Sequence, residues 1–452
     1  MIGVGPFVTL PLIVLAMHGP QAILGWILGA VLAACDGLVW AELGAAMPQA
    51  GGSYAYLRTI YGPQRAGRFL SFLYIWQLSF SAPLSIASGC VGLAQYAGYL
   101  FPWLRRVYFS WSLPIPVPFL HAVPLAIRIG PATGVAMLAC AIAAGLLYRN
   151  IESVTRFSGL LWIGVMTTLL AVIVTGLLHF HARLAFGFPA GAFDLSSGFF
   201  TGLGAALLIA TYDYWGAYNI NFLGAEVRDP GKTIPRAIVW SVGLVAVLYL
   251  LLNTSVLGTM PWQEMVGQNA RLSVAAVVVE RAYGAVAGEV IALLVVWTAF
   301  ASVYALLLGY SRVPYAAALD HNYFRVFARV HPKHRIPHVS LLMLAGVSML
   351  FCVLQLVDLV AALVVIRILL QFLLQQVGVM VLRHTQPEME RPFRIWLYPL
   401  PPVVAILGFL YILFSRPHFA RELVFAGVVV LTGTATYLVR ARGRVEWPFV
   451  PR

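Results

Sequence analysis

Long apolar stretches follow one another along the whole chain, and the short segments between them contain most of the charged residues. A helix needs about 20 residues to cross a bilayer. Eleven stretches are of that order: 22–46, 66–100, 131–148, 155–180, 199–224, 235–258, 284–311, 339–357, 359–382, 396–415 and 420–439. A shorter twelfth stretch lies at residues 2–18. The pattern predicts an all-α polytopic membrane protein, with twelve transmembrane helices in one transmembrane domain that covers residues 1–452.

Two of these stretches are interrupted by residues that weaken a helix. The first contains Gly3, Gly5 and Pro6, and the stretch at 199–224 contains Gly216 beyond its middle. Glycine costs conformational entropy in a helix, and proline removes a hydrogen bond. Each interrupted stretch is the first in a series of five. Broken helices at equivalent places in two halves of a chain indicate an inverted-repeat transporter. We therefore expect discontinuous helices 1 and 6, two five-helix repeats and a final helix pair, at residues 1–180, 199–383 and 396–440.

The composition agrees with a membrane protein, and the charge indicates its orientation. The chain is 61% hydrophobic and 10% charged, whereas soluble domains carry about 25% charged residues. If the start is cytoplasmic, 20 of the 29 Lys and Arg residues fall on the inner side, eight fall outside, and Arg367 lies within a stretch. An excess of positive charge marks cytoplasmic loops. The distribution of the net charge of +13 therefore places both termini inside and does not point to a nucleic-acid partner. We expect a bacterial-type cytoplasmic membrane.

Four sequence motifs follow one another along nearly the whole chain: Ile2–Phe7; Ala41–Pro48 with Gly51–Tyr54; Gly224–Pro230 with Thr233–Arg236; and Ser311–Asp320. At these motifs the chain strongly resembles the amino acid–polyamine–organocation superfamily of secondary transporters. The resemblance implies a leucine-transporter-like fold of twelve helices, with the substrate held beside the breaks in helices 1 and 6.

Two features depart from that family. Its members usually have a cytoplasmic tail and a half-helix before the glycine motif, whereas Met1 lies almost on the motif. We therefore expect either a misassigned start or a form that lacks the inner half of helix 1. Some proton-coupled relatives carry a lysine in helix 5 in place of a sodium ion, and residues 157–164 contain no lysine. That route to proton coupling is not supported here.

Asp213 is an acid inside a membrane-spanning stretch, where a carboxylate costs about 2.5–3.5 kcal/mol to insert. Three interpretations stay open. Asp213 pairs with a cationic group of the substrate, carries the coupling proton, or is locked to a buried arginine such as Arg367. Asp36 is a second acid within a stretch, and we expect a hydrogen-bonded structural group there rather than part of a proton path.

An amino acid presents a carboxylate and an ammonium, and both need partners away from water. The backbone N–H groups of Gly3, Val4 and Gly5, at the start of a half-helix, suit the carboxylate. Carbonyl groups freed at Gly216 suit the ammonium. The alternative is that these glycines only allow close helix packing. Among the aromatic residues of the second interruption, Tyr212 is the predicted cap over the substrate, because the family resembled tends to keep an aromatic gate there.

Two pairs of polar residues lie four positions apart, so that each pair shares a helix face. Gln77 and Ser81 either touch the substrate side chain or form hydrogen bonds between helices. Thr298 and Ser302 carry hydroxyl groups that suit a sodium site completed by helix 1 carbonyls, or they too pack between helices.

Charged residues at the cytoplasmic helix ends are candidates for a gate. Glu226 with Arg228, and Arg312 with Asp320, are predicted to form inner-gate or loop-locking ion pairs, and a purely structural role is the alternative.

The leading hypothesis is a secondary active transporter in the lipid bilayer that imports amino acids, with a proton favoured over sodium as the coupling ion. An exchanger, or a carrier of polyamines and cationic amino acids, is the rival. We expect no enzyme, since no catalytic motif lies within the stretches and all ten histidines lie in loops or near stretch ends. The four cysteines lie inside separate stretches and are predicted to be core residues, so no metal and no cofactor is expected.

Overall fold

The computed structural model describes residues 2–117, 120–148, 151–267, 273–334, 336–355, 364–416 and 418–449. Met1 lies outside the described residues, as do positions 356–363 of the predicted stretches 339–357 and 359–382.

Within the described part of the chain, seven helical spans are long and apolar enough to cross a membrane. They contain α2 (Ile23–Ala46), α4 (Ala66–Leu100), α6 (Ile151–Leu178), α10 (Pro230–Leu257), α14 (Ala285–Tyr310), α18 (Leu374–Thr385) and α20 (Phe419–Arg444). Four shorter apolar helices are α1 (Gly5–Met17), α5 (Pro131–Leu147), α16 (His338–Val353) and α19 (Leu400–Phe414). The chain is therefore a mostly helical, multi-pass integral membrane protein.

The remaining helices are shorter connections, with the exception of α8 (Ser197–Tyr214). They are α3 (Ser53–Ile60), α7 (Ala182–Ala185), α9 (Asn219–Phe222), α11 (Trp262–Met265), α13 (Val274–Tyr283) and α15 (Arg312–Leu319). Single turns of 3₁₀ helix lie at Pro20–Ala22, Pro102–Arg105, Gly224–Glu226 and Arg325–Ala328.

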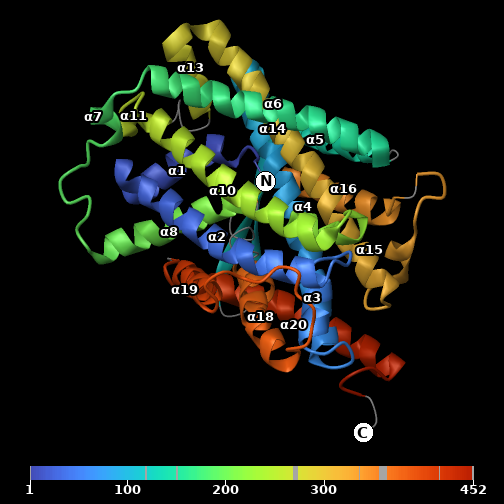
Figure 1. Ribbon diagram of the computed structural model, residues 1–452. Helices are drawn as coiled ribbons and strands as arrows, with labels where there is room; N and C mark the ends of the chain where they lie inside the picture. The colour runs from blue at the N-terminus through green and yellow to red at the C-terminus, as the bar shows by residue number, and fades with distance from the viewer. Residues whose placement is uncertain are drawn as a thin grey trace.

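The helices that surround the centre pack in two groups (Figure 1). In the first, α2 packs against α8 and α10, and α1 packs against α8. In the second, α4 packs against α5, α14 and α16. Small residues allow the close approach in the first group: a Cβ added to Gly25 or Gly29 of α2 would lie 2.8 or 3.0 Å from the Cβ of Ala206 or Ala210 in α8.

The structure contains an antiparallel sheet that the all-α prediction missed. Strands β1 (Phe109–Val117) and β2 (Leu120–Ile129) pair with Phe109 opposite Ile129, and β2 also pairs with β3 (Leu354–Gln355). The sequence of this connection contains several prolines and many β-branched residues. Proline disrupts a helix interior, whereas β-branched residues favour strands. The predicted stretches leave this segment unassigned, and strands β1 and β2 there connect α4 to α5.

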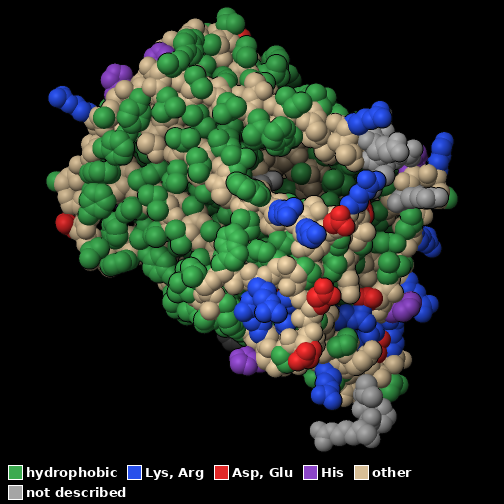
Figure 2. Space-filling view, viewed as in Figure 1, with side chains coloured by type: hydrophobic (Ala, Val, Ile, Leu, Met, Phe, Trp, Pro, Cys, Tyr) green, Lys and Arg blue, Asp and Glu red, His purple; other side chains and the backbone are tan. Residues whose placement is uncertain are grey.

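Charged residues gather at one end of the molecule. In Figure 2 most of the acidic and basic side chains of this face lie to the right and lower right, around α3, α15 and α18, while the rest of the face is largely hydrophobic. The carboxylate of Glu42, buried near the C-terminal end of α2, accepts from Nε of Arg383 at 2.9 Å and lies 3.6 Å from Nε of Arg391. The backbone N–H of Ile395 also donates to it, at 2.7 Å. Ionic contacts therefore fasten α2 to α18 and to the segment that follows it.

Candidate functional site

A cavity of about 550 Å³ lies between the two groups of helices, lined by residues at the start of α1, in α4, at the end of α8 and in α14. Figure 2 shows a hollow beside the place where Figure 1 marks the N-terminus. Ligand pockets in proteins commonly measure about 300–1,000 Å³, so the cavity has the volume needed for a small molecule.

The start of α1 forms one wall of the cavity. Gly3, Val4 and Gly5 line it, and α1 begins at Gly5 with Pro6 in its first turn. The first N–H groups of a helix have no acceptor within the helix. A Cβ added to Gly5 would lie 1.9 Å from Oδ1 of Asp213, and one added to Gly3 would lie 2.8 Å from Oγ of Ser302. A side chain at either position would therefore require the polar side chain of another helix to shift.

The end of α8 forms an adjoining wall. The helix ends at Tyr214, Trp215 has extended backbone angles, and Gly216 has a φ of +119°, which favours glycine. Trp215 and Gly216 both line the cavity. The last carbonyl groups of a helix lack donors within the helix. Backbone donors at the start of α1 and backbone acceptors at the end of α8 therefore border the same cavity.

Asp213 lies between these two helix ends and is 6% exposed. Its Oδ2 accepts a hydrogen bond from the hydroxyl of Thr9 in α1, and its Oδ1 has no hydrogen-bond partner among the described residues. Both residues line the cavity. A buried carboxylate oxygen beside a cavity is an acceptor available to a cationic group or a proton.

Arg367 also lines the cavity, and of the three interpretations of Asp213 the one that locks it to Arg367 does not agree with the contacts. The guanidinium donates instead to the hydroxyls of Tyr218 and Tyr310, to Oγ of Ser85 at 3.3 Å, and to Oε1 of Gln371 at 3.2 Å. The acid and the base therefore occupy the same cavity with separate partners.

The predicted aromatic cap, Tyr212, lines the cavity, and its hydroxyl lies 3.2 Å from Oγ of Ser88 in α4. Gln77 and Ser81 do not line it. Oγ of Ser81 donates to Oε1 of Gln77 at 2.9 Å, and both side chains are buried. Ser85, one turn further along α4, and Ser88 line the cavity instead. The sequence therefore identified the face of α4 that borders the cavity, but not the position along α4 at which it does so.

The predicted hydroxyl pair of α14 is also divided. Oγ1 of Thr298 lies within hydrogen-bond distance of the carbonyl oxygen of Leu294, at 3.0 Å, and of Oγ1 of Thr168 in α6, at 3.1 Å. Ser302, one turn later, lines the cavity beside Gly3. The structure thus brings Ser302 to the start of α1 and directs Thr298 to α6.

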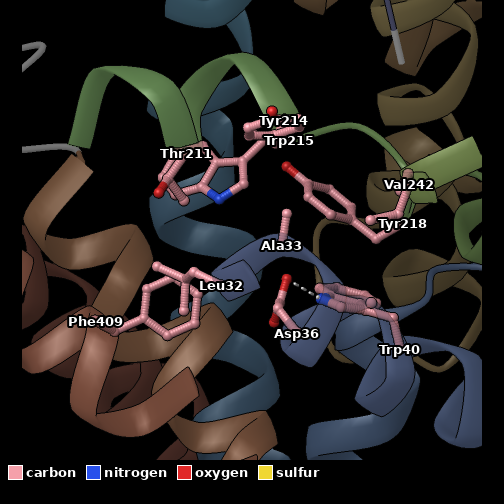
Figure 3. Close-up of a pocket in the computed structure, with 12 residues that line it drawn as sticks. Leu32, Ala33, Asp36, Trp40, Thr211, Tyr214, Trp215, Tyr218, Val242 and Phe409 are labelled. Carbon is pink, nitrogen blue, oxygen red and sulfur yellow. Dashed lines mark hydrogen bonds between the residues drawn. The ribbon is translucent and has the colours of Figure 1, made fainter. Parts of the chain in front are cut away.

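Asp36 of α2 borders a separate small pocket of about 10 Å³. This volume can hold about one water molecule. In Figure 3 its carboxylate points toward the indole of Trp40, whose Nε1 donates to it at 3.1 Å. Nε2 of Gln376 donates to the other oxygen at 2.6 Å. Trp215 and Tyr218 line both pockets. Trp215 and Tyr218 therefore form an aromatic wall that separates Asp36 from the large cavity, and the carboxylate of Asp36 accepts hydrogen bonds from two neutral donors.

The charged residues at the helix ends pair differently from the prediction. Nε of Arg312 lies 3.2 Å from Oε1 of Glu226, and Arg58 of α3 pairs with Asp320. Arg228 is exposed and forms no ion pair within the part of the chain that the structure describes. Arg58 also donates to the hydroxyl of Tyr54 at 3.4 Å, and burial raises the pKa of Tyr54 to about 12. The predicted pairs of sequence neighbours were wrong because partners distant in sequence meet here.

Comparisons with known proteins agree with this architecture. The model of the amino acid permease family matches residues 1–433. The serine/threonine exchanger SteT of Bacillus subtilis is 25% identical over 448 residues, which cover 96% of this chain and 91% of the relative. The branched-chain amino acid permease BcaP of the same organism is 25% identical, with 92% and 86% covered. The human Asc-type amino acid transporter 1 is 28% identical, with 97% and 79% covered. These relatives are transporters rather than enzymes, and the chain belongs to the amino acid permease family of the amino acid–polyamine–organocation superfamily.

Proposed function

We propose that this chain is a secondary active transporter that imports amino acids across the cytoplasmic membrane, with a proton as the coupling ion. The observation that carries the proposal is the cavity bordered by the start of α1 and the end of α8. The N–H groups at Gly3–Gly5 and the positive end of the α1 dipole suit a carboxylate. Carbonyl groups near Gly216 and the free oxygen of Asp213 suit an ammonium.

Asp213 is also the favoured carrier of the coupling proton, since its free oxygen lies at the cavity. Asp36 is the weaker choice, because both of its oxygens accept from neutral donors behind the aromatic wall. A sodium site at Thr298 and Ser302 has less support, because Thr298 is bonded to Thr168 and to Leu294. These contacts favour a proton over sodium.

Alternating access follows from the two groups of helices on either side of the cavity. The group of α1, α2, α8 and α10 can rock against the group of α4, α5, α14 and α16, with the substrate between them. Twelve crossings arranged as two five-helix repeats and a final pair fit this motion, with helices 1 and 6 broken beside the cavity. The charged end is then cytoplasmic, and the pairs Arg312–Glu226 and Arg58–Asp320 lie where an inner gate would close.

An exchanger is the second candidate function, supported by the relative SteT, which is named as a serine/threonine exchanger. A polyamine carrier has less support. The charged residues lining the cavity, within the described part of the chain, are Asp213 and Arg367. A single carboxylate opposed by a guanidinium is poorly suited to a ligand with several positive charges.

The test is uptake of a panel of labelled amino acids into proteoliposomes, with an inward proton gradient and no sodium. We expect saturable, concentrative uptake that a protonophore abolishes, and loss of the proton-driven component in Asp213→Asn. Uptake that needs amino acid inside the vesicles, and ignores the proton gradient, would indicate an exchanger. No uptake and no binding of any amino acid by the folded protein would refute the function.

A further inference from the structure

Arg367 is a buried cation at the cavity with neutral partners. Its side chain is 3% exposed, and its hydrogen-bond acceptors are two phenols, one serine hydroxyl and one amide oxygen. A charge inside a membrane protein is costly unless it is paired. Arg383 and Arg68, by contrast, each reach a carboxylate. Within the described part of the chain, the charge of Arg367 has no anionic partner.

Aromatic rings surround this guanidinium. Its carbon Cζ lies 5.1 Å from the ring centre of Trp215, 5.7 Å from that of Tyr310 and 5.8 Å from that of Tyr218. Ring faces attract a cation and compensate part of its lost hydration. They also keep the local dielectric constant low, which strengthens the attraction to any anion that enters. The surroundings therefore hold Arg367 in place without neutralising it.

One donor of Arg367 is left for a ligand. An arginine has five N–H donors, and the structure assigns one from Nε, one from Nη1 and two from Nη2. The remaining N–H belongs to Nη1, the nitrogen that also contacts Ser85. Both Arg367 and Ser85 line the cavity. The free donor is therefore at the side of the guanidinium that is associated with the cavity-lining serine.

The helix changes its winding directly after this residue. Residues Ile368–Leu373 form a π-helix, and Arg367 is the residue that precedes it. Single π-turns inside helices occur frequently at functional sites. Gln371, within this turn, accepts from Nε of Arg367 and so orients the guanidinium. The π-turn thus helps to orient the Arg367 guanidinium.

We propose that Arg367 binds an anionic group on the substrate side chain, so that the substrates are amino acids with a second carboxylate. The inference rests on the proposed function, which assigns the α-carboxylate to the start of α1 and the ammonium to Asp213 and the end of α8. The side chain is then the group left for the wall formed by Arg367, Ser85 and Tyr310. A carboxylate there supplies the missing counter-charge and an acceptor for the free N–H.

The test compares acidic amino acids with their neutral amides of nearly equal size. Binding and uptake of labelled L-glutamate and L-aspartate are measured beside L-glutamine and L-asparagine, on the full chain in detergent and in proteoliposomes. We expect the acids to be favoured at least tenfold by the unchanged protein. Arg367→Gln should lower the apparent affinity for the acids at least tenfold and leave that for the amides within about threefold. Val379→Ala, a buried change on α18 away from the cavity lining, is the matched control and should keep the preference.

A second variant keeps Arg367 and supplies it with an internal anion. Oγ of Ser85 lies 3.3 Å from Nη1, so Ser85→Asp places a carboxylate against the same guanidinium. We expect it to abolish the preference for acids even if Arg367→Gln fails to fold. Equal losses of acids and amides in a folded Arg367→Gln protein would assign Arg367 to the α-carboxylate and overturn the inference. Binding of neutral amino acids without any preference for acids would overturn it too, while the proposed transport function would stand; binding of no amino acid would refute the transport function itself.

Discussion

Replacing Gly5 by alanine tests the contact between α1 and α8 on which the site depends. The added Cβ would lie 1.9 Å from Oδ1 of Asp213, and ordinary contact begins near 3.4 Å, so the two atoms must separate by about 1.5 Å. The shortest adjustment is a rotation of the Asp213 carboxylate, which breaks its hydrogen bond with Thr9. The rotation also moves the carboxylate away from the substrate ammonium that it is proposed to bind. A hydrogen bond to a charged group contributes about 1.5–3 kcal/mol, and 1.4 kcal/mol corresponds to a factor of ten. We therefore expect a roughly 10- to 150-fold loss of apparent affinity for the amino acid.

The assay is binding of a labelled amino acid to the purified protein, with the thermal midpoint of unfolding measured on the same samples. Gly243→Ala is the matched control. It makes the same change in α10, at an exposed position where a Cβ meets nothing within 4 Å, and should leave the affinity unchanged. If Gly5→Ala binds the amino acid as tightly as the unchanged protein, the contact with Asp213 does not shape the site. If its affinity falls only in step with a general loss of folded protein, Gly5 has a packing role alone.

Three further outcomes follow from contacts between the helices. Glu42→Ala leaves two arginines without their buried carboxylate, so we expect a loss of about 3–5 kcal/mol in unfolding free energy, measured as a lower thermal midpoint; an unchanged midpoint would contradict the ionic anchoring of α2. Arg58 and Asp320 are partly exposed, so a double-mutant cycle on uptake should give a coupling of about 0.2–1 kcal/mol, at most about fivefold; zero coupling would remove the pair from the inner gate. Thr298→Val should cost about 0.5–1.5 kcal/mol in stability without changing how uptake responds to sodium. Ser302→Ala should change the KM for the amino acid. A sodium response of the unchanged protein that disappears in Thr298→Val would instead support a sodium site at this residue.

The positions of the helices were largely predictable from the sequence. The predicted stretches 22–46 and 66–100 agree with α2 and α4 to within one residue, because apolar length is the quantity that the bilayer selects. The structure of the segments between the helices was predicted less well. The hairpin at 109–129 was missed, since the pattern of apolar stretches identifies membrane spans and is silent about the structure of the segments between them.

Contacts between residues distant in sequence account for most of the site that was not predicted. Arg312 meets Glu226 across 86 positions, whereas the predicted pairs were neighbours along the chain. Gln77 lies on the helix face that borders the cavity, but Ser85, two turns further along, reaches it. Spacing by four identifies a face of a helix, and only the packing of other helices determines which level of that face borders the cavity.

The separation of the two charges at the cavity explains how binding can favour closure. Asp213 is held by Thr9 and Arg367 by two tyrosines, so neither charge neutralises the other before the substrate arrives. Both therefore carry a cost of burial that their neutral partners relieve only in part. An amino acid that presents an ammonium and a second carboxylate relieves both costs at once, and most strongly when the helices close and exclude water. A ligand shifts a conformational equilibrium only by its difference in affinity between the two states. Tighter binding of such a substrate in the closed state than in the open state would therefore supply the energy that brings the two helix groups together.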